Sequence, residues 1–248
     1  MKIIPAIDIQ NGNCVRLKQG DFSQETIFNH SPLDIAEKWV KDGAQRLHIV
    51  DLDGARLGSP INIELISKIC KTFPNVPIQI GGGIRNLETA RKYINAGASF
   101  IIIGTKAVED SNFVKDLCSE FHKKIIIGID AKNGEVATEG WVSNSKVNAI
   151  SLSKKFEDFG VSEIVYTDIE KDGMMKGLNI KATVDLAKEI NIPVIASGGV
   201  SSNDDLKKIN GYEKYGISGV IIGRALYENK INIKEAQEIL RNMKNVVN

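Results

Sequence analysis

Two aspartates at matching places in the two halves of the chain have the spacing expected of an acid–base pair. Asp8 closes an apolar run in the segment PAIDIQNGN, and Asp130 closes a similar run in IGIDAKNGE, about 120 residues further on. Paired carboxylates suit a reaction that needs both an acid and a base, because their surroundings can raise one pKa while the other group stays ionised. A single aspartate at such a place more often caps the following turn. The matching positions favour catalysis.

Glycine-rich segments follow four other apolar runs, again in two matching sets. A glycine turn that leads into a helix lets backbone N–H groups approach an anion at the positive end of the helix dipole. One such cluster would fit a simple tight turn equally well. Two matching sets predict a ligand with a phosphate at each end, whose reacting centre lies between the two aspartates. The predicted phosphate cradles are Gly82, Gly83, Gly104 and Thr105 in the first half and Gly198, Gly199, Gly223 and Arg224 in the second.

The elements that position these residues are consecutive β-α units. Apolar runs of strand length alternate with amphipathic stretches of helical length, and near-continuous runs such as IIIG are typical of parallel strands covered on both faces. In a closed barrel of eight strands the first and fifth lie opposite each other, which places Asp8 across one pocket from Asp130. The predicted strands are Ile3–Asp8, Leu47–Asp51, Pro77–Gly81, Phe100–Gly104, Ile125–Asp130, Glu163–Thr167, Pro193–Ser197 and Gly219–Gly223, and candidate helices include Leu33–Asp42, Ile61–Thr72, Leu87–Asn95 and Ile180–Glu189.

The length of 248 residues suits one α/β domain of the (β/α)8 TIM barrel class, spanning 1–248. Four segments repeat in the same order: PAIDIQNGN and IGIDAKNGE, HIVDLDGA and VYTDIEKDGM, IQIGGGI and VIASGGV, IIIGTKAV and VIIGRALY. Two similar (β/α)4 halves, approximately 1–123 and 124–248, are therefore predicted. The alternatives are a general likeness of β-α units and an open doubly wound sheet; the shared polar residues argue against the first and the missing GxGxxG against the second.

Composition excludes several classes of partner. Lys and Arg number 32 against 31 Asp and Glu, so no net field attracts nucleic acid or an anionic membrane. Cys14, Cys70 and Cys118 are far apart, which predicts reduced thiols. We find no signal peptide pattern and no apolar run of membrane-spanning length, and we expect a cytoplasmic protein. Three histidines in unrelated contexts and no HExxH spacing predict catalysis without a metal or other cofactor.

Other polar residues fall where they could line the pocket. His48 lies inside the second predicted strand, where packing in the barrel interior and contact with a substrate are equally compatible with the sequence. Arg16 and Arg85 follow strands one and three, and both could also be solvated surface charges. Trp141 follows strand five and could stack on a heterocycle or be a partly buried loop residue. Strand ends supply Asp51, Thr167 and Asp168.

Together, the segments IIPAIDIQNGNCVRL, HIVDLDGA, IQIGGGIR, YTDIEKDGM, ASGGV and VIIGRALYE resemble the histidine-biosynthesis isomerases that act on phosphoribosylformimino-5-aminoimidazole carboxamide ribotide. The resemblance spans essentially the whole chain. The sister family, the cyclase subunit of imidazole glycerol phosphate synthase, shares the duplicated barrel and some of these motifs. The opening Pro5-Ala6-Ile7-Asp8 and the pair Gly140-Trp141 look like the isomerase.

The resemblance implies an Amadori rearrangement of this ribotide, the aminoaldose ProFAR, to the aminoketose PRFAR. We also expect no obligatory protein partner and a monomeric enzyme. Carried over by position, Asp130 would be the general acid, Asp8 the general base and Thr167 an auxiliary to the acid. The stretch Val142–Ser145 departs from the family pattern, which often has a glutamate followed by threonine or serine. Besides the phosphate cradles, the implied substrate-binding residues are Arg16, His48, Arg85, Trp141 and Gly173.

Three alternatives to this activity are open at the level of sequence. One is a cyclase that works with a glutaminase partner, and another is a phosphosugar-binding barrel without turnover. The latter would leave two carboxylates unexplained in an anion-binding pocket. The third concerns specificity alone: phosphoribosylanthranilate, the analogous tryptophan-pathway substrate with one phosphate, could be accepted as well.

Overall fold

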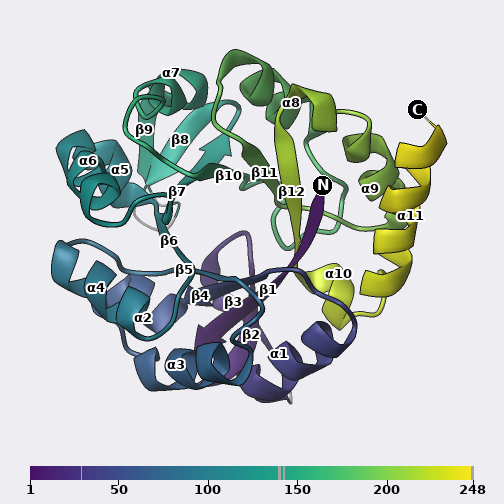
Figure 1. The fold of residues 1–248 in the computed structure, drawn as a ribbon, viewed down its shortest axis with the longest axis horizontal. Helices are drawn as coiled ribbons and strands as arrows, with labels where there is room; N and C mark the ends of the chain where they lie inside the picture. The colour runs from purple at the N-terminus through teal and green to yellow at the C-terminus, as the bar shows by residue number, and fades with distance from the viewer. Residues whose placement is uncertain (29, 139–140, 142, 247–248) are drawn as a thin grey trace.

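Eight parallel strands close into a barrel. The computed structural model describes residues 1–28, 30–138, 141 and 143–246. Hydrogen bonds between β10 and β7 complete the ring, and β1 and β7 are four places apart in it, on opposite walls (Figure 1). The (β/α)8 barrel predicted from the sequence is confirmed. In ring order the strands are β1 (Lys2–Gln10), β4 (Leu47–Asp51), β5 (Ile78–Gly81), β6 (Phe100–Ile103), β7 (Ile125–Lys132), β10 (Glu163–Asp168), β11 (Val194–Ser197) and β12 (Ile217–Ile222).

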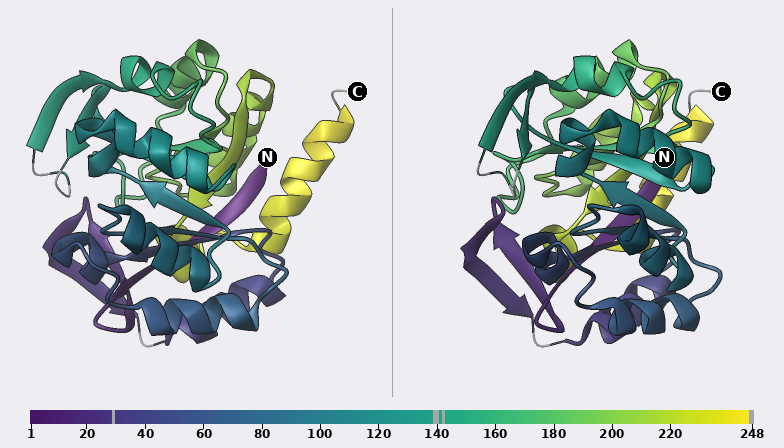
Figure 2. Two further views of the ribbon diagram at one scale, coloured as in Figure 1. Left: turned by 60° about the vertical axis from the view of Figure 1, so that its left-hand side comes forward. Right: turned by 90° about the vertical axis from the view of Figure 1, so that its left-hand side faces the viewer.

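Two strands run past the predicted ends and carry antiparallel extensions. β1 and β7 each continue two residues beyond their aspartate because β1 pairs with β2 (Asn13–Lys18) and β7 with β8 (Glu135–Thr138). β3 (Asp21–Phe28) and β9 (Ser143–Asn148) complete these hairpins. Both hairpins project from the same end of the barrel (Figure 2). They follow the carboxyl ends of their strands, so they lie at the end where barrel enzymes place their active sites.

The helices form the outer layer. Most are amphipathic, and several begin at a side-chain cap, such as Asn86 before α4 and Asn179 before α8. The predicted bounds of α4 and α8 are confirmed, whereas α3 starts two residues late because the amide of Asn62 binds Asp51 and Asp53. The helices are α1 (Pro32–Lys41), α2 (Leu52–Leu57), α3 (Ile63–Thr72), α4 (Leu87–Asn95), α5 (Thr105–Glu109), α6 (Ser111–Glu120), α7 (Ala149–Lys154), α8 (Ile180–Glu189), α9 (Asn203–Asn210), the 3-10 turn η1 (Glu213–Tyr215), α10 (Arg224–Tyr227) and α11 (Ile233–Val246).

The core has two shells because side chains alternate along each strand. Residues such as Ile3 and Ile49 face outwards and pack against helix residues such as Trp39. The inner shell is a smaller apolar layer inside the barrel, formed by Ile4, Ala6, Ile102, Ile126, Val165, Ile195 and Ile221. The three cysteines are buried and unpaired. None of the described helices is long and apolar enough to cross a membrane.

Tight contact between neighbouring loops explains part of the glycine pattern. Gly82 has φ +118°, and a Cβ there would collide with the carbonyl oxygen of Asp51. We expect Gly82→Ala to lower the free energy of unfolding by about 2–4 kcal/mol, because strain and collision add. Gly12, which has φ +75° and open space within 4 Å of the point where a Cβ would lie, is the matched control. Gly12→Ala should cost only about 1 kcal/mol; equal losses in urea unfolding would contradict the packing argument.

Candidate active site

Asp130 sits in a hydrogen-bonded recess on β7. Its carboxylate accepts a hydrogen bond of 2.8 Å from Nε1 of Trp141. The hydroxyl of Thr167, the directly paired residue on β10, also bonds to it. Burial raises the pKa of Asp130, although both hydrogen bonds oppose this rise. A carboxyl group with a raised pKa keeps its proton longer as the pH rises, which is what a general acid requires.

Asp8, on the opposite wall, has a cationic partner. Arg16 on β2 donates from Nη1 to Asp8, and each of these side chains is 13% exposed. Nη2 of Arg16 also donates to the carbonyl of Ala6, at 3.3 Å, and the guanidinium lies 5.8 Å from the ring centroid of Tyr227. Burial alone would lower the pKa of Arg16, but the neighbouring Asp8, Tyr227 and Asp172 outweigh it and raise the value. The guanidinium is therefore a fixed positive charge beside Asp8.

A third carboxylate belongs to the same site and escaped sequence reasoning. Asp172, in the loop after β10, is close enough to feel the charges of Asp8, Asp130 and Arg16. Burial raises its pKa to about 6, while Arg16 and the backbone N–H of Gly173 work in the opposite direction. The available signal was the repeat itself, since the Asp-Gly of YTDIEKDGM corresponds to the Asp-Gly of HIVDLDGA.

The raised pKa of Asp172 gives a pH-dependent stability. Between its ordinary value of 3.8 and about 6 the folded state binds more protons than the unfolded chain. The free energy of unfolding should therefore fall as the pH rises from about 4 to about 6. We expect Asp172→Asn to flatten this fall and to be more stable than the wild type at neutral pH by about 1–2 kcal/mol. Urea unfolding at both ends of the range measures this, and parallel pH curves for the two proteins would contradict it.

Three loops meet over the carboxylates. A Cβ on Gly20, between β2 and β3, would collide with the indole of Trp141, so the two hairpins touch. The N–H of Gln19 donates to the carbonyl of Asp172 at 3.3 Å. A Cβ on Gly173 would lie 2.7 Å from the carbonyl of Leu17. These contacts hold the hairpin of the first half against the loops of the second. The predicted loop contacts at Gly140 and Val142 lie outside the described residues.

The predicted phosphate cradles have matching geometry in the two halves. A Cβ on Gly198 would collide with the carbonyl of Asp168, as one on Gly82 would with that of Asp51. Gly104 precedes α5 with φ −97° and ψ −111°, and Gly223 precedes α10 with φ −106° and ψ −103°. No side chain caps the amino terminus of either short helix, where the first backbone N–H groups of a helix have no partner within the helix. The second glycine of each loop also lies close to a backbone carbonyl. Gly83 faces the carbonyl of Gly54, and Gly199 faces that of Gly177.

Two strand-end aspartates support loops instead of lining the pocket. Asp51 is fully buried and accepts hydrogen bonds from the N–H of Gly54, from Asn62 and from the hydroxyl of Tyr93. Asp168 binds Asn179 at 2.6 Å, and the two pairs have the same separation of 11 residues along the chain. These bonds hold the β4–α3 and β10–α8 loops in place.

Arg85 and Arg224, two further predicted binding residues, have protein partners. Arg85 donates to the carbonyl of Ala55 at 2.9 Å and lies against Gly58. Arg224 pairs with Glu228 and donates to the carbonyl of Gly173 at 3.1 Å, which ties α10 to the loop that carries Asp172. Thr105 begins α5, directly after Gly104.

His48 lies inside the barrel. It pairs with Ala6 of β1, two residues before Asp8, and its ring contacts Gln79 of β5. Burial lowers the pKa of His48 to about 3, and the charge of Arg16 adds to this effect. His48 is therefore a neutral imidazole just below the carboxylates. The described residues contain no group of three or more His, Cys, Asp or Glu that could hold a metal ion.

The eight-stranded barrel has opposed carboxylates at the carboxyl ends of its strands, the end at which enzymes of the (β/α)8 class carry their active sites. The chain belongs to the histidine biosynthesis protein family, whose model matches residues 2–232. A relative from Marinobacter nauticus is 53% identical over 99% of this chain and 100% of its own length. One from Acinetobacter baylyi is 54% identical over 97% and 98%, and one from Ruthia magnifica 53% over 96% and 98%. All three are named 1-(5-phosphoribosyl)-5-((5-phosphoribosylamino)methylideneamino)imidazole-4-carboxamide isomerase.

Proposed function

We propose that the chain is the isomerase that converts ProFAR to PRFAR in histidine biosynthesis. The observation that carries the proposal is the pair of unlike carboxylates, Asp130 with a raised pKa and Asp8 held against Arg16, on opposite walls of one barrel. The relatives that share more than half of its residues bear the name of this activity. An aldose–ketose rearrangement needs an acid at one atom and a base at another, and this pair supplies both.

In the proposed sequence, Asp130 first donates a proton to the ring oxygen of the aminoaldose ribose, and the ring opens to a Schiff base. Asp8 then removes the proton from C2, and the resulting enolamine becomes the aminoketose. Thr167 and Trp141 hold the Asp130 carboxyl group through their hydrogen bonds. Asp172 is a third carboxyl group within reach of the same charges. To complete the step, C1 of the enolamine gains the proton held by Asp8 and the hydroxyl on C2 gives its proton back to Asp130, so both carboxyl groups are reset and no atom is gained or lost.

The two phosphates would occupy the two predicted cradles. The nearly equal backbone angles of Gly104 and Gly223 support this, as do the uncapped helices that each of them precedes. The shared Asp–Asn pairs after β4 and β10 support a duplicated half-barrel as the origin of both sites. We further expect the enzyme to be a cytoplasmic monomer without an obligatory partner protein.

An assay of the purified protein with ProFAR tests the proposal directly. We expect conversion to PRFAR, seen by chromatography of the product. Phosphoribosylanthranilate in a parallel assay decides whether a second aminoaldose is accepted. PRFAR with ammonia tests the cyclase alternative, for which cleavage and ring closure without isomerisation would be diagnostic. Tight binding of ProFAR with no turnover in any assay would leave only a binding role and overturn the proposal.

A further inference from the structure

A polar column runs up the inside of the barrel to His48. Gln79 is fully buried, and its amide nitrogen lies 2.9 Å from Nδ1 of His48 on the neighbouring strand. Its amide oxygen lies 3.1 Å from Nη1 of Arg46, at the amino-terminal end of the barrel. Among the described residues, Gln79 is therefore the one link in this column between the charged cluster below and the imidazole above. Sequence reasoning missed it, because it is the single polar residue between Ile78 and Ile80.

The chemistry of Arg46 fixes which way the Gln79 amide points. A guanidinium group only donates hydrogen bonds, so the atom of Gln79 that faces it must be the oxygen. The amide NH2 then faces His48. An amide NH2 only donates, and so the Nδ1 atom that it meets must be the acceptor. In a neutral imidazole the proton then resides on Nε2.

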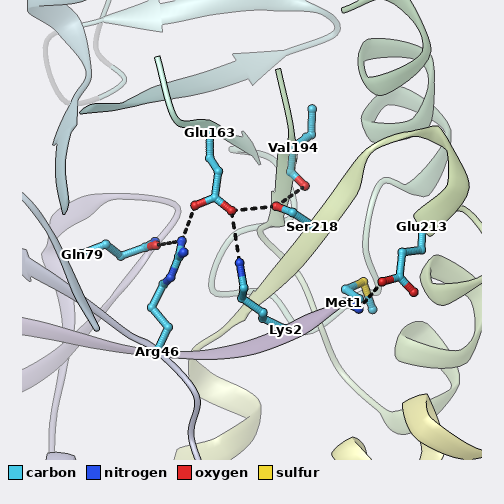
Figure 3. Close-up of polar contacts among 8 residues, drawn as sticks. All are labelled: Met1, Lys2, Arg46, Gln79, Glu163, Val194, Glu213 and Ser218. Carbon is cyan, nitrogen blue, oxygen red and sulfur yellow. Dashed lines mark hydrogen bonds and ion pairs between the residues drawn. The ribbon is translucent and has the colours of Figure 1, made fainter. Parts of the chain in front are cut away.

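Arg46 is itself held from several sides, as Figure 3 shows. It pairs with Glu163, whose side chain is 7% exposed, and its guanidinium stacks on the ring of Phe100 with a centroid distance of 4.3 Å. Lys2 lies 3.7 Å from Glu163, and the hydroxyl of Ser218 donates to Glu163 at 3.0 Å. Residues of β5, β6 and β10 thus contact the guanidinium directly, and residues of β1 and β12 contact its partner Glu163. The orientation of the guanidinium, and with it that of Gln79, is set by charge and packing together.

The other nitrogen of the ring, Nε2, is not the atom that contacts Gln79. None of the described residues forms a hydrogen bond with Nε2 of His48, and Nε2 is not among their fully buried polar atoms without a partner. The apolar inner shell closes the barrel below His48. Solvent therefore reaches the ring from the open end, where Asp8 and Arg16 lie.

We propose that Gln79 is a positioning residue that holds His48 as the Nε2–H tautomer, so that the ring donates a hydrogen bond to an acceptor oxygen of the sugar bound between Asp8 and Asp130. The part that concerns the sugar rests on the proposed function; the tautomer does not. A neutral donor can bind a sugar oxygen without placing another charge beside Arg16. The charged cluster at the far end of the barrel would thus contribute to substrate binding through one amide.

The tautomer is measured by ¹⁵N NMR of histidine-labelled, substrate-free protein, with the His48 signals assigned from their absence in His48→Gln. The chain has 3 histidines, so overlap is small. In the wild type we expect Nδ1 to have the shift of an unprotonated nitrogen and Nε2 that of a protonated one. Gln79→Glu places an acceptor beside Nδ1 while retaining a partner for Arg46, so the proton should move to Nδ1. Gln79→Met keeps the shape without a donor and should give a mixture.

Kinetics with ProFAR separates positioning from a general structural effect. We expect both Gln79 variants to raise KM about tenfold, with a smaller change in kcat, as loss of one substrate hydrogen bond would do. Ser218→Ala is the matched control, because it removes a contact to Glu163 in the same cluster without touching Gln79. It should leave the His48 shifts and KM unchanged. Thermal unfolding of each variant confirms that the fold is retained.

Two results would overturn the inference. One is an Nδ1–H signal for His48 in the wild type, or no change of tautomer in Gln79→Glu. The other is a changed tautomer with an unchanged KM, which would remove the role in binding. If the wild type does not convert ProFAR at all, the proposed function fails, whereas the NMR measurement still decides the tautomer.

Discussion

An Asp130→Asn variant should lose between about a hundredfold and ten-thousandfold in kcat, the usual contribution of a general acid, while remaining folded. The amide can still accept the Trp141 hydrogen bond but has no acidic proton to give to the ribose oxygen. Because burial raises the pKa of Asp130, the charged form is the unfavourable one in the fold. A neutral amide removes that cost, so the variant should be at least as stable as the wild type.

Turnover of ProFAR and urea unfolding, measured on the same preparation, test both halves of this expectation. Asp116→Asn, on the exposed face of α6, is the control for a general effect of removing a carboxylate. It should change neither quantity. An Asp130→Asn enzyme that keeps about a tenth of its turnover would not fit the role of general acid. A large loss of stability would mean that the group is ionised and paired in the fold.

The barrel strands were predictable because parallel strands covered on both faces are apolar almost throughout. All eight observed strands overlap the predicted runs, and the opposition of Asp8 and Asp130 follows from their order. The hairpins were not predicted. β3 is almost wholly exposed, and so its sequence carries no apolar alternation that could mark a strand. The sequence pattern also places Arg16 in a loop, whereas it lies on β2, a short strand of six residues.

Long-range contacts between polar residues were the other limit of the sequence. Arg16 could have been a solvated charge, and only the fold brings it to Asp8. Asp172 lies in a turn without periodicity, and its pKa depends on residues from three distant segments. The sequence allows Trp141 a stacking role, whereas its indole binds Asp130. Close backbone contact at Gly82 and Gly198 requires glycine with or without a phosphate, so the glycine pattern has a packing cause of its own.

Asp8→Asn should be equally inactive but less stable, in contrast with Asp130→Asn. Removing the carboxylate eliminates the base for the C2 proton, with a loss in kcat of about a hundredfold to ten-thousandfold. It also leaves the Arg16 guanidinium, which is only 13% exposed, without its ion-pair partner. The remaining carboxylate of Asp172 partly compensates, so we expect a loss of about 1–3 kcal/mol in the free energy of unfolding.

ProFAR deuterated at C2 of the reacting ribose distinguishes the two roles. If Asp8 removes this proton, replacing Asp8 should make deprotonation at C2 the rate-limiting step. Asp8→Asn should then show a larger primary isotope effect on kcat than the wild type. In Asp130→Asn ring opening should be limiting instead, and the isotope effect should be small. A double variant that also carries Arg16→Gln should recover stability without recovering turnover, because it removes the unpaired charge but restores no base. Equal isotope effects in the two single variants would contradict the assignment of Asp8 as base and Asp130 as acid.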